Sequence, residues 1–265
     1  MSSAASREER EALVDVAVPA PRPGALALGA VWLGVAAAWV GVAHLVVGGR
    51  PLITGPVETA RAFVEAGPAL WVDLAATLAR ALAGLGLGFV AGVALGLVTG
   101  GLARLTKAAD GVLDFARSVP PVLVLPLFLL TLGYSDAARV LTVATGVSVI
   151  VAAGVSTAMQ AKASGRREQL RLAGASWWQV LRWTQPFEAL PPLLVSTRVA
   201  AAMAIVIATV TELVAPAASG IGVRVIGAQI AGNTGELTAC LLAIGLAGWL
   251  VGWPLTRLHR RLRGA

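Results

Sequence analysis

The sequence predicts an all-helical integral membrane protein, an all-α fold with about six transmembrane helices. Three observations support this fold class: 57% of the 265 residues are hydrophobic, only 13% are charged, and the mean hydropathy is +0.79. A soluble domain carries about 25% charged residues. The polar surface is therefore too small to cover a water-soluble globule, and one membrane-embedded domain is the simplest interpretation.

Six apolar runs are candidates for the transmembrane helices, because a spanning helix needs about 20 mostly apolar residues. The predicted spans lie near residues 25–47, 74–100, 119–133, 138–159, 191–215 and 236–256. The third run is short and contains Pro120, Pro121 and Pro126, so a kinked or partly re-entrant segment is an alternative there. The resulting organisation is a polar tail over residues 1–24, a transmembrane domain over 25–258 and a basic tail over 259–265.

Two connections between the spans have helical character of their own. Residues 54–68 are predicted to form a short external helix, with Pro56 in its first turn and Gly67-Pro68 at its end. Residues 160–190 form the longest connection on the opposite side, and their helical pattern is not apolar enough to span a membrane.

The distribution of Lys and Arg predicts the orientation of the chain. With six spans, both termini lie on one side of the membrane. That side holds fifteen Lys and Arg residues, and the other side holds four. Cytoplasmic loops carry the excess of positive charge, so both termini are predicted to be cytoplasmic. The net charge of +7 follows from this topology and does not indicate binding of nucleic acid.

The sequence shows no arrangement of residues for covalent chemistry. Cys240 is the only cysteine, and neither His44 nor His259 has a partner at metal-ligand spacing, so no metal site is predicted. Neither a nucleophile–base set nor a carboxylate pair is present. A Gly-rich phosphate loop ending in Gly-Lys-Ser/Thr is also missing. The chain is therefore not expected to be an enzyme, to hold a cofactor, or to hydrolyse ATP alone.

The second predicted span carries a glycine at every fourth position. Steps of four residues keep these glycines on nearly one helix face, where another backbone can approach closely. The stripe is expected to face protein, either as a seam that slides during transport or as plain packing. Its members are Gly84, Gly88, Gly92, Gly96 and Gly100.

Ionisable residues within spans are expensive and are candidates for function. Arg80, Arg198 and Glu212 are such residues, and each either lines a solute path or has a structural role, which we favour. An ion pair between Arg80 and Glu212 is geometrically possible. Further candidates for the path are Pro120, Pro126 and Thr209.

The connection over 160–190 contains an unusual cluster of large side chains. A short helix runs from Glu168 to Ala173, Gly174 supplies a bend, and Ala175 leads into a second short helix. Several tryptophans on such a polar connection are best explained by burial at a protein interface. A helix lying among lipid headgroups is the alternative. The second helix carries Trp177, Trp178, Val180, Leu181 and Trp183.

These residues resemble the inner-membrane permease subunits of ABC importers, and in particular the branch for nitrate, sulfonate and taurine. The resemblance rests on a cytoplasmic Glu-Ala-Ala loop in which a glycine follows the glutamate by six residues, as Gly174 follows Glu168. Gln169 and Leu170 replace the two alanines. Other similarities extend over residues 50–258, among them Ala79-Arg80, Arg117-Ser-Val-Pro120 and Ser219-Gly-Ile-Gly222.

The resemblance implies a type I (MetI-like) ABC importer permease in the inner (plasma) membrane. It implies a second permease subunit, so that a homodimer surrounds the path, two ABC ATPase subunits that bind ATP and Mg, and an extracytoplasmic solute-binding protein. The loop at 160–190 would be the coupling helix that docks on the ATPase. The competing hypothesis is a secondary transporter or channel driven by an ion gradient, but the span centres lack Asp and Glu.

Overall fold

The structure, a computed structural model, describes residues 25–47, 50–51, 53–101, 106–160, 169–170 and 172–263. Helices account for nearly all of these residues, in agreement with the predicted fold class. The chain divides into two compact units, Met1–Pro56 and Val57–Ala265. The long helices other than α2 belong to the second unit.

The first unit contains helix α2 (Ala25–Ala43) and a small hairpin of β1 (Val46–Val47) and β2 (Arg50–Pro51). The two strands pair antiparallel, with Val47 opposite Arg50. The indole Nε1 of Trp39 donates a hydrogen bond to the carbonyl oxygen of Thr54 at 3.0 Å. The helix predicted over 25–47 therefore stops at Ala43, and its last residues form a strand, which β-branched valines favour.

Helix α3 (Pro56–Gly101) contains both the external helix and the second predicted span. A break at Gly67, with φ 56° and ψ −147°, separates the two parts. Only glycine adopts such a backbone conformation readily, and Pro68 cannot donate the hydrogen bond that would continue the first part. The structure thus shows the predicted helix before the second span and its end at Gly67-Pro68.

The third predicted span is strongly bent. It consists of α4 (Thr106–Ser118), the 3₁₀ turn η1 (Pro121–Val124) and α5 (Leu125–Leu132), and its two limbs meet at 85°. Proline disfavours a helical backbone in the residue before it, so Val119 and Pro120 interrupt the helix. The range predicted from hydropathy, 119–133, covers only the second limb. The prediction therefore missed the first limb, α4, whose polar residues are typical of a loop.

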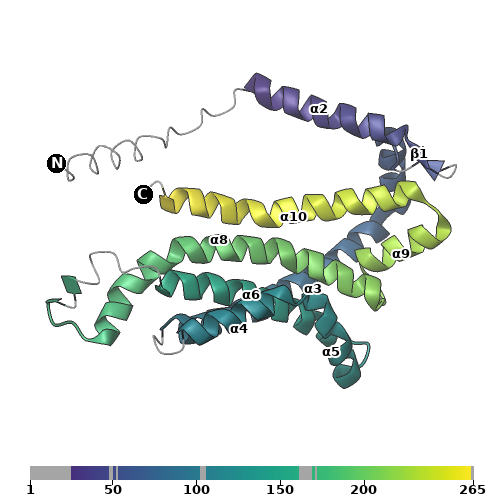
Figure 1. Cartoon of the computed structure of the whole chain (residues 1–265). Coiled ribbons are helices and arrows are strands. Elements are labelled where there is room, and N and C mark those ends of the chain that lie inside the picture. The colour runs from purple at the N-terminus through teal and green to yellow at the C-terminus, as the bar shows by residue number, and fades with distance from the viewer. Residues whose placement is uncertain are drawn as a thin grey trace, which may run out of the picture. The chain divides into compact units, whose positions relative to one another are not determined.

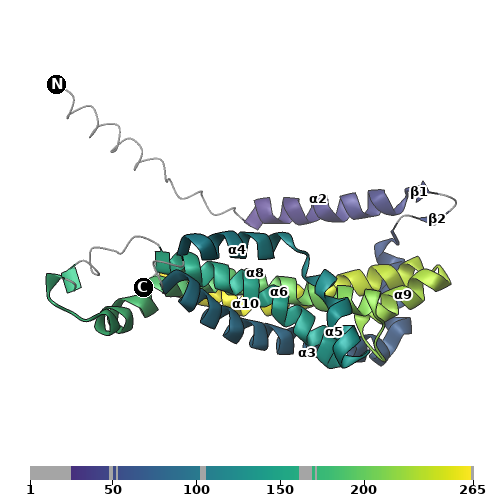
Figure 2. The same cartoon turned by 60° about the horizontal axis from the view of Figure 1, so that its bottom comes forward.

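The remaining helices are α6 (Asp136–Gln160), α8 (Trp177–Val214), α9 (Ile221–Ala231) and α10 (Thr234–Arg263). Figures 1 and 2 show α6, α8 and α10 side by side, with α5 and α9 at the end of the bundle where α6 begins. Residues 177–190 do not form a separate short helix, because α8 continues through them. The spans predicted near 138–159, 191–215 and 236–256 are all helical.

Helix α6 forms the centre of this bundle. The most apolar stretch of α6 is 56% buried, against 28–33% for the corresponding stretches of α3, α8 and α10. One face of α6 presents Val143, Val147, Val151 and Val155 to the core, where alanines of α8 also lie. The same valines contact α3, as described next.

The glycine stripe of α3 packs directly on α6. A Cβ atom added to any of the five glycines would lie 2.5–2.7 Å from atoms of α6, closer than real Cβ contacts allow. Gly84 faces Val143 and Gly96 faces Val155, a constant offset of 59 residues, so the two helices run parallel. The expectation that the stripe faces protein is confirmed.

Four helices of the described chain are long and apolar enough to cross a membrane, and the bent pair makes a fifth candidate. The apolar part of α2 that is described, Gly29–Ala43, is shorter than a full span. The chain is thus a multi-pass membrane protein, with a smaller number of clear spans among the described residues than the six predicted.

Candidate functional site

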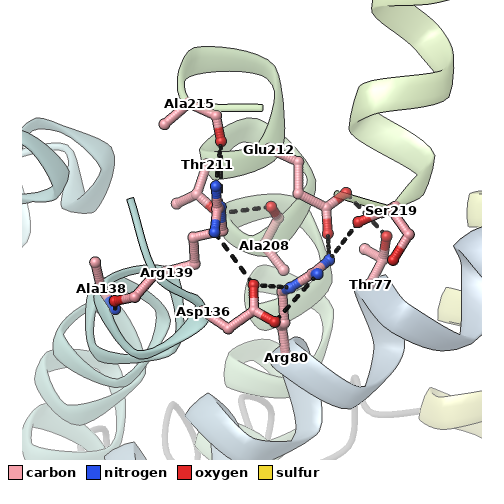
Figure 3. Close-up of polar contacts among 12 residues, drawn as sticks. Thr77, Arg80, Asp136, Ala138, Arg139, Ala208, Thr211, Glu212, Ala215 and Ser219 are labelled. Carbon is pink, nitrogen blue, oxygen red and sulfur yellow. Dashed lines mark hydrogen bonds and ion pairs between the residues drawn. The ribbon is translucent and has the colours of Figure 1, made fainter. Parts of the chain in front are cut away.

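The centre of the largest polar cluster is an ion pair between Arg80 on α3 and Glu212 on α8. Arg80 Nη1 donates to Glu212 Oε1 at 2.7 Å, and the Glu212 side chain is completely buried (Figure 3). The second carboxylate oxygen accepts hydrogen bonds from Thr77 Oγ1 and from the backbone N–H of Gly222, both at 2.9 Å. The ion pair that the sequence allowed is therefore present, and both oxygens of the buried carboxylate have partners.

Arg80 also connects α3 to two further segments. Its Nε donates to Asp136 Oδ1 at 2.8 Å, and its Nη1 donates to the carbonyl oxygen of Ser219 at 2.8 Å. Asp136 is the first residue of α6, and Ser219 lies between α8 and α9. One guanidinium thus joins α3, α6 and the end of α8.

A second buried arginine, Arg139, closes the end of α8. Its side chain is 2% exposed and donates to the carbonyl oxygens of Ala215 and Pro216, each at 2.9 Å from Nη2 (Figure 3). Nη1 donates to Asp136 Oδ1 at 3.1 Å. A cation at a helix C-terminus satisfies free carbonyls and the helix dipole. The sequence predicts Arg139 to be one of the four Lys and Arg on the side opposite the termini, and the structure shows that it lies in the first turn of α6.

The Ser219-Gly-Ile-Gly222 motif is shaped by the buried glutamate. A Cβ on Gly220 would lie 2.5 Å from Glu212 Oε2, and a Cβ on Gly222 would lie 2.6 Å from Glu212 Cβ. Gly220 also has φ 144°, which other residues rarely adopt. Glycine is therefore required at both positions for this turn to close over Glu212.

An adjoining chain of polar contacts extends to α9 and α10. Arg224 on α9 donates from Nε to Asp73 Oδ2 at 2.8 Å and from Nη1 to Glu236 Oε1 at 2.7 Å. Burial works against the charge of Arg224, but its hydrogen bonds to the carboxylates of Asp73 and Glu236 outweigh burial and raise its pKa above the usual value. Gly220 N–H donates to Asp73 Oδ1 at 3.0 Å, which joins this chain to the motif.

We call these side chains together the polar network. It connects α3, α6, α8, α9 and α10 at the end of the bundle where α6 begins. Its charged side chains pair with one another, so the network acts as a structural cross-link between the helices. The network consists of Asp73, Thr77, Arg80, Asp136, Arg139, Glu212, Arg224 and Glu236.

A different kind of site lies beside the bend of the third span. Two adjacent grooves, of about 570 and 500 Å³, run between α4, η1, α6 and α8. Arg117, Ile150 and Val199 line both of them. We call the two together the bend groove. Irregular backbone within a membrane is tolerated where it lines a cavity, so this is the candidate solute-contacting surface of the chain.

The other predicted path residues do not gather at one site. Pro120 and Pro126 are exposed at the bend and on α5. Thr209 donates its hydroxyl to the carbonyl of Ile205 within α8. Arg198 is exposed on α8 and has no hydrogen-bond partner among the described residues. Arg80 and Glu212 are the two candidates that meet.

The predicted coupling segment is described in part. Gly174 has φ 77°, Ala175 N–H donates to the carbonyl of Leu170, and Ser176 forms a capping box with Gln179 at the start of α8. A bend at Gly174 between two helical pieces is therefore confirmed. Glu168 and the side chains of Trp177, Trp178, Val180 and Leu181 lie outside the described part of the structure.

Comparison with known proteins assigns these features to one family. The model of the family described as binding-protein-dependent transport system inner membrane component matches residues 70–264. The aliphatic sulfonates transport permease protein SsuC of Bacillus subtilis is 28% identical over 180 residues, which cover 66% of this chain and 65% of that protein. The match thus spans less than two thirds of the relative's own length.

A second relative and a solved structure agree with that match. The taurine transport system permease protein TauC of Escherichia coli is 27% identical over 210 residues, which cover 79% of this chain and 74% of that protein. A chain of the MetNI methionine ABC transporter in an inward-facing conformation superposes with a TM-score of 0.66 at 20% identity. This superposition covers 75% of this chain and 98% of the other, and it confirms the MetI-like fold.

Proposed function

The chain belongs to the family of binding-protein-dependent transport system inner membrane components, and from this we propose that it forms the translocation path of an ATP-driven importer. The observation that carries the proposal is the family match over residues 70–264, which includes the bend groove and the segment around Gly174. A separate subunit supplies ATP hydrolysis, and a solute-binding protein delivers the solute.

We place both termini on the cytoplasmic side of the inner membrane. Arg117 and Arg139 lie within candidate membrane spans, in the bent pair and in α6, and leaving these two out of the loop charges gives fourteen Lys and Arg on one side and three on the other. This imbalance still supports cytoplasmic termini. The same orientation puts Gly174 and the start of α8 in the cytoplasm, where an ATPase would meet them.

The segment at Gly174 is the proposed contact with the ATPase. The bend and the capping box fix the direction in which α8 leaves the helical piece before it. Leu172, on that piece, is 80% exposed, as an apolar contact residue would be in the absence of its partner. Glu168, Ala173, Ala175 and the Trp-containing start of α8 would complete the docking surface.

The solute we propose is a small organosulfonate or a related small compound. SsuC and TauC are named for transport of aliphatic sulfonates and taurine. A second copy of the permease would face the first across the path, with the bend groove and the exposed face of α8, which carries Arg198, on the solute side. The polar network would hold the helices together and stay outside the path.

Reconstitution with candidate ATPase and binding-protein subunits tests this function. Uptake of labelled taurine or butanesulfonate into proteoliposomes should require ATP and stop when vanadate traps the ATPase. Uptake that survives ATP depletion would contradict the proposal and favour transport driven by an ion gradient.

A further inference from the structure

Arg117 is a charged residue at the bend of the third span. It lies in the last turn of α4, two residues before the break at Val119, and it lines both parts of the bend groove together with Ile150. Ile150 is well inside α6, about 20 Å from the start of that helix at 1.5 Å per residue. The groove beside Arg117 therefore follows the middle and the later part of α6, from Thr145 to Thr157.

Among the residues that the structure describes, Arg117 is the only charged one that lines the bend groove. The groove also contains the hydroxyls of Thr145, Thr157 and Ser196, but each donates to a carbonyl of its own helix at 2.8–3.0 Å. The free hydrogen-bond donors in the groove therefore come mainly from the guanidinium. Most other residues that line the groove are apolar, and an apolar lining strengthens the attraction of the guanidinium for an anion.

The guanidinium retains donors for a further ligand. Nε donates to the carbonyl oxygen of Leu113, and Nη2 forms an ion pair with the exposed Asp114, one turn earlier on α4. Asp114 does not line the groove. A guanidinium has five N–H groups, so about three have no partner among the described residues, and the side chain is 51% exposed. By contrast, Arg80 and Arg139 are almost fully buried and fully engaged in the polar network.

We propose that Arg117 binds the anionic group of the solute in the bend groove and so selects for small organic anions. This inference rests on the proposed import function, whose solute it narrows. The groove volume, about 500–570 Å³ in each part, is in the range of small-molecule sites. The planar guanidinium fork matches the oxygens of a sulfonate or carboxylate.

The test measures charge selectivity in the groove with thiol reagents and needs neither ATP nor a known solute. Val199, which lines both parts of the groove and is 50% exposed, is replaced in the Val199→Cys variant of the full chain in proteoliposomes. The probes are methanethiosulfonate ethylsulfonate, an anion, and its trimethylammonium analogue, a cation. Each rate is divided by the rate with a free thiol, and the unsubstituted chain, whose Cys240 is buried, is the blank.

We expect the anionic reagent to be favoured at Val199→Cys, and the anion-to-cation ratio to fall at least about tenfold when Arg117→Gln is added. Arg117→Lys should keep most of the preference. Asp114→Asn is the matched control: it removes the neighbouring carboxylate and should leave the preference intact or increase it. In the Val57→Cys variant, whose position is exposed on the external helix outside the groove, Arg117→Gln should change nothing.

An unchanged ratio in Arg117→Gln would overturn the inference, and so would an equal loss in Asp114→Asn, because Arg117 would then act only through Asp114. A thiol at Val199→Cys that neither reagent reaches would also overturn it, since lipid or a second copy would then fill the groove. The import function is tested separately by ATP-dependent uptake, so its failure is distinguishable from failure of this inference.

Discussion

Arg80 and Glu212 are 132 residues apart in the chain, yet Arg80 Nη1 lies 2.7 Å from Glu212 Oε1 in a site closed to solvent. The pair ties the span that follows the external helix to the end of α8. Because Glu212 has further partners in Thr77 and Gly222, the pair is part of the fold. Its removal should change stability before it changes solute specificity.

Arg80→Met is expected to lower the stability of the purified protein by about 3–5 kcal/mol, because it leaves the carboxylate of Glu212 buried without its counter-charge. Glu212→Leu should have a similar effect. The double variant Arg80→Met/Glu212→Leu should be more stable than either single one, since no charge is left unpaired. Thermal unfolding in detergent measures all three. An Arg80→Met variant that is as stable as the wild type but does not transport would contradict this prediction. It would indicate that Arg80 lines the solute path.

The close contact between the glycine stripe of α3 and α6 predicts opposite effects of alanine at Gly92 and at Gly86 on stability. Gly92→Ala puts a Cβ 2.7 Å from the carbonyl oxygen of Ser148 and should destabilise the protein by about 1–3 kcal/mol. Gly86→Ala is the control, because no atom lies within 4 Å of its added Cβ. It should be neutral or stabilise by up to about 1 kcal/mol through helix propensity. Equal unfolding temperatures for both variants would mean that α3 and α6 are not in such close contact.

The bend at Gly174 should depend on its left-handed backbone and not on its small size. At φ 77°, alanine is strained by about 1 kcal/mol, whereas asparagine tolerates this region. No atom lies within 4 Å of an added Cβ, so neither residue collides in the free chain. Gly174→Ala should weaken co-purification of the ATPase subunit more than Gly174→Asn does. The reverse order would show that the bend is not needed for docking.

Arg198→Ala should separate transport from stability. The side chain is exposed and has no partner among the described residues, so the unfolding temperature should stay within about a degree of the wild type. Initial uptake in reconstituted vesicles should fall several-fold if the exposed face of α8 lines the path. Wild-type uptake with normal assembly would remove Arg198 from the path.

Hydropathy predicted the parts of the fold that depend on long apolar runs and on backbone chemistry. The helices near 138–159, 191–215 and 236–256 and the break at Gly67-Pro68 follow from the sequence alone. Helix α4 was missed because Asp114, Arg117 and other polar residues made it look like a loop. Helix α9, with 11 residues, was too short for the span criterion.

Most contacts of the polar network could not be predicted from the sequence. Arg139 and Arg224 counted as loop charges, although Asp136 three residues before Arg139 was a local signal for an ion pair. Their other partners are backbone carbonyls and carboxylates far away in the chain, among them Ala215 and Asp73. Glycine spacing likewise predicted that the stripe of α3 faces protein but not that α6 would be the partner.

Photo-crosslinking from Leu172 tests the central claim most directly, namely that an ATPase subunit docks beside Gly174. A photo-reactive amino acid replaces Leu172, which is 80% exposed, or Leu130 on α5, which is 84% exposed and serves as the control. The account predicts an adduct with the ATPase subunit from position 172 and none from position 130. Adducts from position 172 with lipid alone, in a membrane that contains the ATPase, would contradict it.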